Sequence, residues 1–173
     1  MALIDVVRTY LEMRSPDALR AAGPPHGPAD LRVERRASPD VAEYRALYRA
    51  VGEGYHWRDR LQWSDERLAA WLADPQLSLW ILIVDGERAG YFELWCDGAE
   101  GAVELVYFGL AQPFIGRGLG KFLLTRAVEE AWRLPGTRRV WLHTCTLDDR
   151  AALPNYLARG FVETRKEAYV TEI

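Results

Sequence analysis

Phe114-Ile115-Gly116-Arg117-Gly118-Leu119-Gly120-Lys121 is the stretch that decides how this chain folds. Its three glycines separate two regular patterns. Val103 to Leu110, before it, is rich in branched and aromatic residues, as is typical of a strand. Lys121 to Trp132, after it, is apolar at helical spacing. Glycine lets backbone N–H groups approach a ligand, and a helix start adds free N–H groups and a positive dipole end. The pattern therefore predicts a site for a phosphate-bearing cofactor.

Two familiar glycine fingerprints do not fit this loop. A P-loop requires Ser or Thr after its Gly-Lys pair, whereas Phe122 follows Lys121 here. The dinucleotide fingerprint requires Gly-x-Gly-x-x-Gly, whereas the spacing here is Gly116-x-Gly118-x-Gly120, and no second strand–helix unit follows. A plain glycine-rich turn that starts a helix remains the alternative.

The loop resembles the acyl-CoA-binding motif of the GNAT superfamily of N-acetyltransferases, which reads Gln/Arg-x-x-Gly-x-Gly/Ala after a strand with a bulge. Residues 117–120 match its core, and Ile115 stands where Gln or Arg is usual. Residues 149–161 resemble the second cofactor motif, Asn-x-x-Ala-x-x-x-Tyr-x-x-x-Gly-Phe. Asp149 replaces its Asn, and both residue types are good helix caps. The resemblance extends over residues 77–170.

The resemblance implies an α/β (α+β) fold with a mixed, mostly antiparallel central sheet flanked by helices. It also implies acetyl-CoA as cofactor and direct acetyl transfer to a primary amine of a small molecule or peptide. A non-catalytic acyl-CoA-binding regulatory module is the alternative. The residues expected at the cofactor are Phe108, Leu110, Ile115, Gly116, Arg117, Gly118, Leu119, Gly120, Lys121 and Asn155.

Acyl transfer to an amine requires a neutral amine, and neutralising a lysine-like amine at pH 7 costs about 4.6 kcal/mol. A general base therefore helps. Glu104 matches the general base of the histone-acetylating branch, and Tyr156 matches the superfamily's general acid. A solvent-facing Glu104 and a core tyrosine are the alternatives. His143 could replace Glu104 as the base, although a packing role is favoured for it.

Glu93 is a candidate second carboxylate at the acceptor site. In a regular hairpin it would lie nearly opposite Glu104 and raise the pKa of that base by like-charge repulsion. The favoured alternative is that Glu93 faces solvent.

Three residues between the first two helices, Tyr55, His56 and Trp57, fall in the region that lines the acceptor site in similar proteins. Aromatic rings there could stack on a ligand or close over a cation. A packed aromatic corner is the alternative for this segment.

The other patterns predict a simple organisation. Strands are expected over 6–13, 31–35, 77–84, 89–95 and 140–145, and helices over 38–51 and from Ser64 to near Pro75. Asp85-Gly86 predicts a hairpin turn. We expect one domain over residues 1–173, with residues 1–30 forming an N-terminal strand and a Pro/Gly-rich extension.

Composition narrows the class of protein. A net charge of −3 argues against general nucleic-acid binding. No run of 18 apolar residues predicts a membrane span, and residues 1–13 lack the apolar block of a signal peptide. The two cysteines give neither a disulfide framework nor zinc spacing, so no metal is expected. These features favour a cytoplasmic enzyme and leave a homodimer open.

Overall fold

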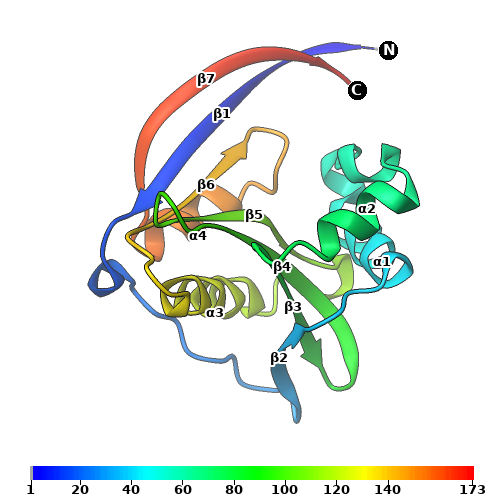
Figure 1. Cartoon of the computed structure of the whole chain (residues 1–173). Coiled ribbons are helices and arrows are strands. Elements are labelled where there is room, and N and C mark those ends of the chain that lie inside the picture. The colour runs from blue at the N-terminus through cyan, green and yellow to red at the C-terminus, as the bar shows by residue number, and fades with distance from the viewer. Residues whose placement is uncertain (1) are drawn as a thin grey trace.

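A computed structural model describes residues 2–173 and shows one seven-stranded sheet with helices on both faces (Figure 1). The strands lie in the order β2-β3-β4-β5-β6-β1-β7. Their bounds are β1 Leu3–Met13, β2 Leu31–Arg36, β3 Leu77–Val84, β4 Glu87–Asp97, β5 Ala102–Leu110, β6 Arg139–Cys145 and β7 Val162–Glu172. The helices are α1 Val41–Gly52, α2 Asp65–Leu72, α3 Leu119–Arg133 and α4 Ala152–Ala158. The predicted mixed, mostly antiparallel fold class is confirmed.

The sheet opens between β5 and β6. Every neighbouring pair of strands is antiparallel except this one, which is parallel and extends over three residue pairs, from Ala102–Arg139 to Glu104–Trp141. A β-bulge follows at once, because Leu105 pairs with Leu94 and Tyr107 with Glu93. Val106 is left as the extra residue, and a bulge of this kind bends its strand and increases the twist. The bulge expected before the glycine loop is therefore present.

Each face of the sheet has its own apolar core. Helices α3 and α4 cover one face, where the largest buried side chains include Leu11, Met13 and Phe92. Helices α1 and α2 cover the other face, where Tyr44 and Tyr91 are fully buried. Burial of these apolar surfaces, at about 25 cal/mol per Å², is the main force that holds the helices to the sheet.

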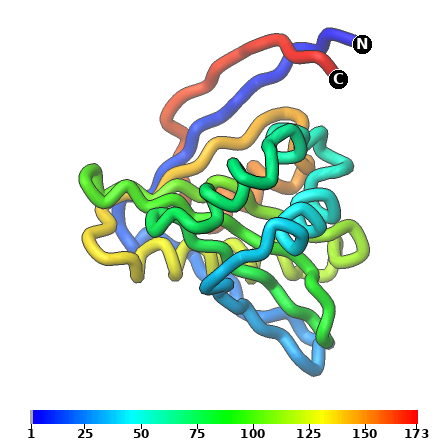
Figure 2. The backbone as a smooth tube through the Cα atoms, turned by 45° about the vertical axis from the view of Figure 1, so that its right-hand side comes forward, coloured from blue at the N-terminus to red at the C-terminus, as the bar shows by residue number. Residues whose placement is uncertain are grey.

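The N-terminal strand lies inside the sheet. Residues 8–13 of β1 pair with β6, and residues 3–12 pair with β7 on the other side. Because β6 ends at Cys145, opposite Arg8, the outer part of β1 pairs with β7 alone. The two strands form a ribbon that extends beyond the rest of the sheet and carries both termini, as both views show (Figures 1 and 2). Strand β7 has no counterpart among the elements predicted from the pattern.

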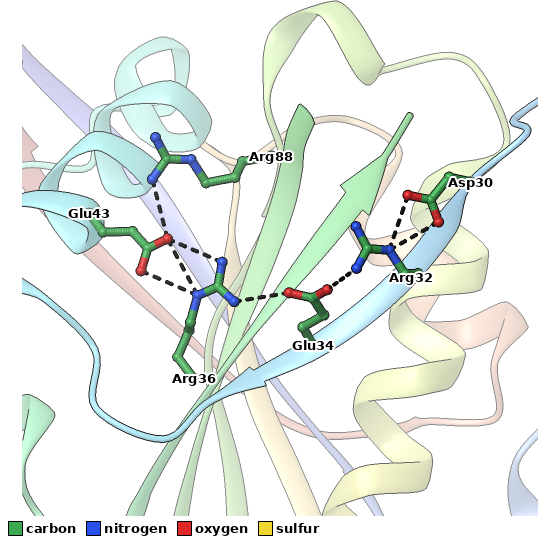
Figure 3. A network of polar contacts seen from close by, with 6 residues as sticks. All are labelled: Asp30, Arg32, Glu34, Arg36, Glu43 and Arg88. Atoms are coloured by element: carbon green, nitrogen blue, oxygen red, sulfur yellow. Dashed lines mark hydrogen bonds and ion pairs between the residues drawn. The ribbon is translucent and has the colours of Figure 1, made fainter. Parts of the chain in front are cut away.

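The opposite edge strand, β2, is protected by charge. An alternating chain of ion pairs runs along it and continues to α1 and β4 (Figure 3). Its members are Asp30, Arg32, Glu34, Arg36, Glu43 and Arg88. Charged side chains on an edge strand discourage pairing with another chain, so this edge is an unfavourable site for sheet extension.

Local signals at element ends are confirmed. Asp40 and Ser64 cap α1 and α2 through their side chains, and Asp85 and Gly86 form the β3–β4 turn with φ angles of 48° and 84°. Positive φ at both central residues is the requirement of a type I′ hairpin turn. Within residues 2–173, no helix is long and apolar enough to cross a membrane.

Candidate active site

A cleft opens where β5 and β6 part. Its cavity of about 570 Å³ is lined by the second half of β5, the glycine loop, the α1–α2 connection, α4 and the end of β6. The short parallel pairing creates this space, because the two strands share no hydrogen bonds beyond Glu104. A second cavity of about 580 Å³ adjoins the first.

The glycine loop forms one end of the cleft. Gly116 and Gly118 have φ angles of 82° and 75°, values that side chains rarely adopt, and a Cβ on Gly116 would meet nothing within 4 Å. Gly118 is the N-cap of α3 and supplies no side-chain cap, so the first N–H groups of that helix remain free to donate hydrogen bonds. An open turn of glycines before an uncapped helix start suits a phosphate group. The loop therefore fits the pyrophosphate of acetyl-CoA.

Eight of the ten residues predicted at the cofactor line this cleft: Phe108, Leu110, Ile115, Gly116, Gly118, Gly120, Lys121 and Asn155. The other two do not. Leu119 is buried in the core, and the guanidinium of Arg117 lies 5.2 Å from the ring centre of Phe114. The side chains of Arg117 and Leu119 are therefore poor candidates for cofactor contact, although their backbone belongs to the loop.

Tyr156 lies on α4 and reaches the cleft from the face of the sheet that α3 and α4 cover. Its ring packs edge-on against Phe108 and Phe161, each at 6.2 Å between ring centres. Its hydroxyl has no hydrogen-bond partner among residues 2–173, while the residue lines the cavity. Burial, and then the charge of Asp148, raises the pKa of Tyr156 above its ordinary value, so the group stays protonated.

The segment before α4 differs from the expectation that Asp149 caps this helix. The N-cap position is Ala151, without a side-chain cap. Asp149 instead accepts a hydrogen bond from the Ala151 N–H at 2.8 Å, which forms a turn before the helix. Its second oxygen accepts from the Tyr55 hydroxyl at 2.9 Å, so Asp149 links the two sides of the cleft. Pro154 falls in the first turn of α4, where proline is tolerated.

Glu104 is half-buried on the sheet face that α1 and α2 cover. Burial raises the pKa of this carboxyl, and the nearby guanidinium of Arg60 lowers it in part. Glu104 itself is not among the residues that line either cavity, whereas its neighbours Leu105 and Val106 are.

Glu93 is fully buried, so the favoured expectation that it faces solvent is wrong. Its carboxylate accepts hydrogen bonds from the Tyr44 hydroxyl and, at 3.3 Å, from Trp71 Nε1, and Arg60 Nη2 lies 3.8 Å away. The bulge also corrects the expected register, because Glu93 pairs with Tyr107 and Glu104 with Trp95. Burial raises the pKa of Glu93 against the opposing effect of Arg60.

The predicted acceptor residues Tyr55, His56 and Trp57 all line the cleft. Trp57 also packs: its ring lies 4.8 Å from the ring centre of Tyr107, and a Cβ on Gly52 would come within 2.5 Å of it. Packing and ligand contact are thus compatible for this segment.

His143 lines both cavities and lies 5.6 Å from Tyr10, ring centre to ring centre. Burial, and then the charge of Arg8, lowers the pKa of its imidazole, so the ring is neutral near pH 7. It makes no hydrogen bond within the described part of the chain. Its place in the cavity lining is compatible with a role as a second base, and its contact with the Tyr10 ring is compatible with the packing role.

Sequence reasoning missed Arg8 and Arg60, which both reach the cleft system. No local pattern identifies them. Of the two, only Arg60 has a sequence feature that could have drawn attention to it, because it lies in a segment rich in aromatic residues.

Known proteins resemble this chain in sequence pattern and in fold. The model of the acetyltransferase (GNAT) family matches residues 43–161. No protein with a curated function matches the chain in sequence.

Solved structures share the fold at low identity. A GCN5-related N-acetyltransferase from Kribbella flavida has 19% identity and a TM-score of 0.63, and covers 97% of this chain. One from Sphaerobacter thermophilus has 20% identity and a TM-score of 0.64, and covers 96%. An aminoglycoside acetyltransferase from an uncultured soil metagenomic sample, in complex with sisomicin, has 16% identity and a TM-score of 0.62, and covers 75%. This chain spans 58%, 50% and 87% of their respective lengths.

Proposed function

Because this chain belongs to the GNAT acetyltransferase family, we propose that it is an acetyl-CoA-dependent N-acetyltransferase that transfers the acetyl group directly to a primary amine. The single observation that carries the proposal is the cleft between β5 and β6. It has an open glycine turn and an uncapped helix start at one end, and the protonated hydroxyl of Tyr156 along its length. We also propose that the protein acts in the cytoplasm.

The loop residues would hold the cofactor mainly through backbone groups. Gly116 and Gly118 turn the chain so that N–H groups of the loop and of the first turn of α3 face one region. The ammonium of Lys121, which lines the same end, adds a compensating positive charge. Bound acetyl-CoA supplies an acyl group activated as a thioester.

The base in this proposal is Glu104. A carboxyl whose pKa is raised by burial is a better match to an amine than an ordinary glutamate. Its position beside the cleft calls for one water between carboxylate and amine. Neutral His143, which lines the cavity directly, is the alternative acceptor for that proton.

The acid in this proposal is Tyr156. Its hydroxyl carries a proton that no other described residue accepts, so it is available to the thiolate that leaves the acyl group. A hydrogen bond to that developing charge stabilises the transition state more than the ground state, which is how such a group accelerates a reaction.

A covalent route has one feature in its favour, because Cys145 lines the cleft. An acyl-cysteine route requires a base that activates the thiol. Among the residues described, neither His143 nor Asp148 accepts a hydrogen bond from the Cys145 thiol, and Asp148 is engaged by Thr144 and by the Cys145 backbone. Direct transfer is therefore the better proposal.

The test is thiol release from acetyl-CoA in the presence of a panel of amines. The panel would include amino acids, polyamines, aminoglycosides and peptides, since one solved relative is an aminoglycoside acetyltransferase. Amine-dependent thiol release that survives Cys145→Ser would support direct transfer. Tight acetyl-CoA binding with no turnover for any amine would instead support the non-catalytic acyl-CoA-binding module.

A further inference from the structure

The second cavity is the far end of the cleft. It shares five lining residues with the first, namely Arg8, Asp59, Val106, Tyr107 and His143. It contains no residue of the glycine loop or of α4. A ligand could therefore enter the second cavity without meeting the region assigned to the cofactor's phosphates. The end of the ligand that lies at Tyr107 and Val106 would reach the gap between β5 and β6.

Arg60 is built into this cavity as a fixed cation. Its side chain is only 9% exposed, and its guanidinium lies 3.9 Å from the ring centre of Trp63 and 4.5 Å from that of Trp71. One terminal nitrogen is 3.8 Å from Glu93. The Nε–H group is buried and has no hydrogen-bond partner in the described chain. A buried donor without a partner is costly, so a ligand oxygen at this point would satisfy it.

Two further guanidinium groups face the same space. Arg67, on α2, lies 3.9 Å from the ring centre of Trp63 and forms no ion pair with any carboxylate of residues 2–173. Arg8 lines the cavity from β1; its Nε is also buried and has no hydrogen-bond partner among residues 2–173, and Glu167 lies 3.9 Å from its Nη1. Asp59 is the one carboxylate among the residues that line the cavity.

Among the lining residues, three guanidinium groups outnumber the one carboxylate, which favours a negatively charged ligand. Arg60 and Arg8 are partly balanced from outside the cavity by Glu93 and Glu167, so Arg67 is the guanidinium that has no carboxylate within 4.0 Å in the described chain. Guanidinium also matches the planar or tetrahedral array of oxygens in carboxylates and phosphates better than a point charge does. Polycationic amines would meet repulsion from these guanidinium groups.

We propose that the acceptor amine carries an oxyanion, a carboxylate or a phosphate, which Arg60, Arg67 and Arg8 bind in the second cavity while the amine points toward the β5–β6 gap. This inference rests on the proposed function and narrows its substrate class. The anionic group is the specificity element, and its distance from the amine is set by the span from Arg60 to Val106.

The first experiment compares matched amines in the thiol-release assay. Leucine is paired with leucinamide, and 5-aminopentanoate with 5-aminopentanamide. Amidation also lowers the pKa of the adjacent leucine amine, so the 5-amino pair, whose amine is remote from the carboxylate, isolates the anionic charge. We expect the acidic member to be preferred in kcat/KM by about tenfold or more in at least one pair. Neutral members that are used equally well or better would overturn the inference and leave the proposed function intact.

Variants connect that preference to the cavity. Arg67→Gln and Arg8→Gln should each raise KM for the acidic amine about tenfold and leave KM for acetyl-CoA unchanged. Arg133→Gln is the matched control, because Arg133 is 61% exposed at the far end of α3, outside both cavities. Unchanged KM values in the cavity variants would overturn the assignment.

If no amine is acetylated, the proposed function is refuted but the anion site is not yet tested. A binding experiment then tests that site by itself. The arginine Nε–H signals of nitrogen-15-labelled protein would be followed by NMR during titration with inorganic sulfate. Saturable shifts of the Arg60 and Arg67 signals, weakened by Arg8→Gln, would support the anion site. Unshifted signals would overturn it.

Discussion

Replacing Tyr156 by phenylalanine should slow acetyl transfer about 10- to 150-fold while leaving the folded protein almost as stable. The loss follows from the assigned role. A hydrogen bond to a charged group contributes about 1.5–3 kcal/mol, and each 1.36 kcal/mol corresponds to a factor of ten in rate. The thiolate charge develops in the transition state, so the loss should appear in kcat rather than in acetyl-CoA affinity.

The structure explains why stability should change little. The Tyr156 hydroxyl has no partner in the described residues, so its removal breaks no hydrogen bond within the protein. The ring contacts with Phe108 and Phe161 remain in the variant. We expect the free energy of unfolding to change by less than about 1 kcal/mol, or about 2–4 °C in Tm.

Tyr91→Phe is the matched control. The Tyr91 hydroxyl likewise has no partner among residues 2–173, but it is buried under α1 on the other face of the sheet and does not line the cleft. The assay combines initial rates of thiol release, calorimetry with CoA and a thermal melt. A Tyr156→Phe enzyme with wild-type kcat would refute the acid role. Equal losses in rate and affinity would indicate binding, and the same loss of rate in Tyr91→Phe would indicate a general effect on packing.

Three further predictions concern the loop and the two carboxylates. Gly118→Val should abolish acetyl-CoA binding in calorimetry. The control is Gly136→Val, which should carry a similar backbone cost of about 1–2 kcal/mol without loss of affinity, because Gly136 has a φ of 76° in an open turn. Equal losses of affinity in the two variants would contradict the backbone role. Activity should fall as the pH drops through the raised pKa of Glu104, and Glu104→Gln should remove this limb of the pH–rate profile. A variant that keeps the wild-type limb and rate would exclude Glu104 as the base and leave water, His143 or a substrate that arrives already neutral. The raised pKa of Glu93 means that the folded protein binds more protons than the unfolded chain, so wild-type stability should fall as pH rises from the usual glutamate range to that pKa. Urea unfolding should show a smaller fall for Glu93→Gln, in which only Glu104 still contributes, and a pH-independent difference between the two proteins would contradict the prediction.

Local chemistry made much of the fold predictable. The hairpin at Asp85-Gly86 and the caps at Asp40 and Ser64 depend on residues within one turn of the chain. The glycine loop is similar, since its conformation and the start of α3 depend on its own residues. These features could be predicted because no distant contact is needed to determine them.

Strand β7 and the placement of β1 could not be predicted in the same way. Most of β7 is exposed and five of its 11 residues are charged, so it lacks the apolar alternation that marks a half-buried strand. The position of β1 between β6 and β7 is a property of the assembled sheet. Arg8 enters the cleft only because of that placement.

The error at Glu93 has a similar origin. A glutamate in a strand is usually solvent-exposed, and its burial here depends on Tyr44, 49 residues away, together with Arg60 and Trp71. The bulge at Val106 then shifts the register so that Glu93 and Glu104 are not opposite each other. A single extra residue in β5 is invisible in the apolar pattern, so the pairing could not be derived from it.

The cleft itself is a consequence of sheet topology rather than of any motif. Beyond Glu104, β5 hydrogen-bonds to β4 alone, so its other edge faces the gap with backbone N–H and C=O groups that need partners in water or in a ligand. The β5–β6 pairing ends at Glu104 and Trp141, beyond which β6 pairs with β1 on its other edge only, and the Tyr55–Asp149 hydrogen bond spans the cleft. The glycine loop could therefore predict what binds at one end. The far end, with Arg60, is defined only once three distant segments meet, which is why the specificity of the acceptor must be derived from the folded chain.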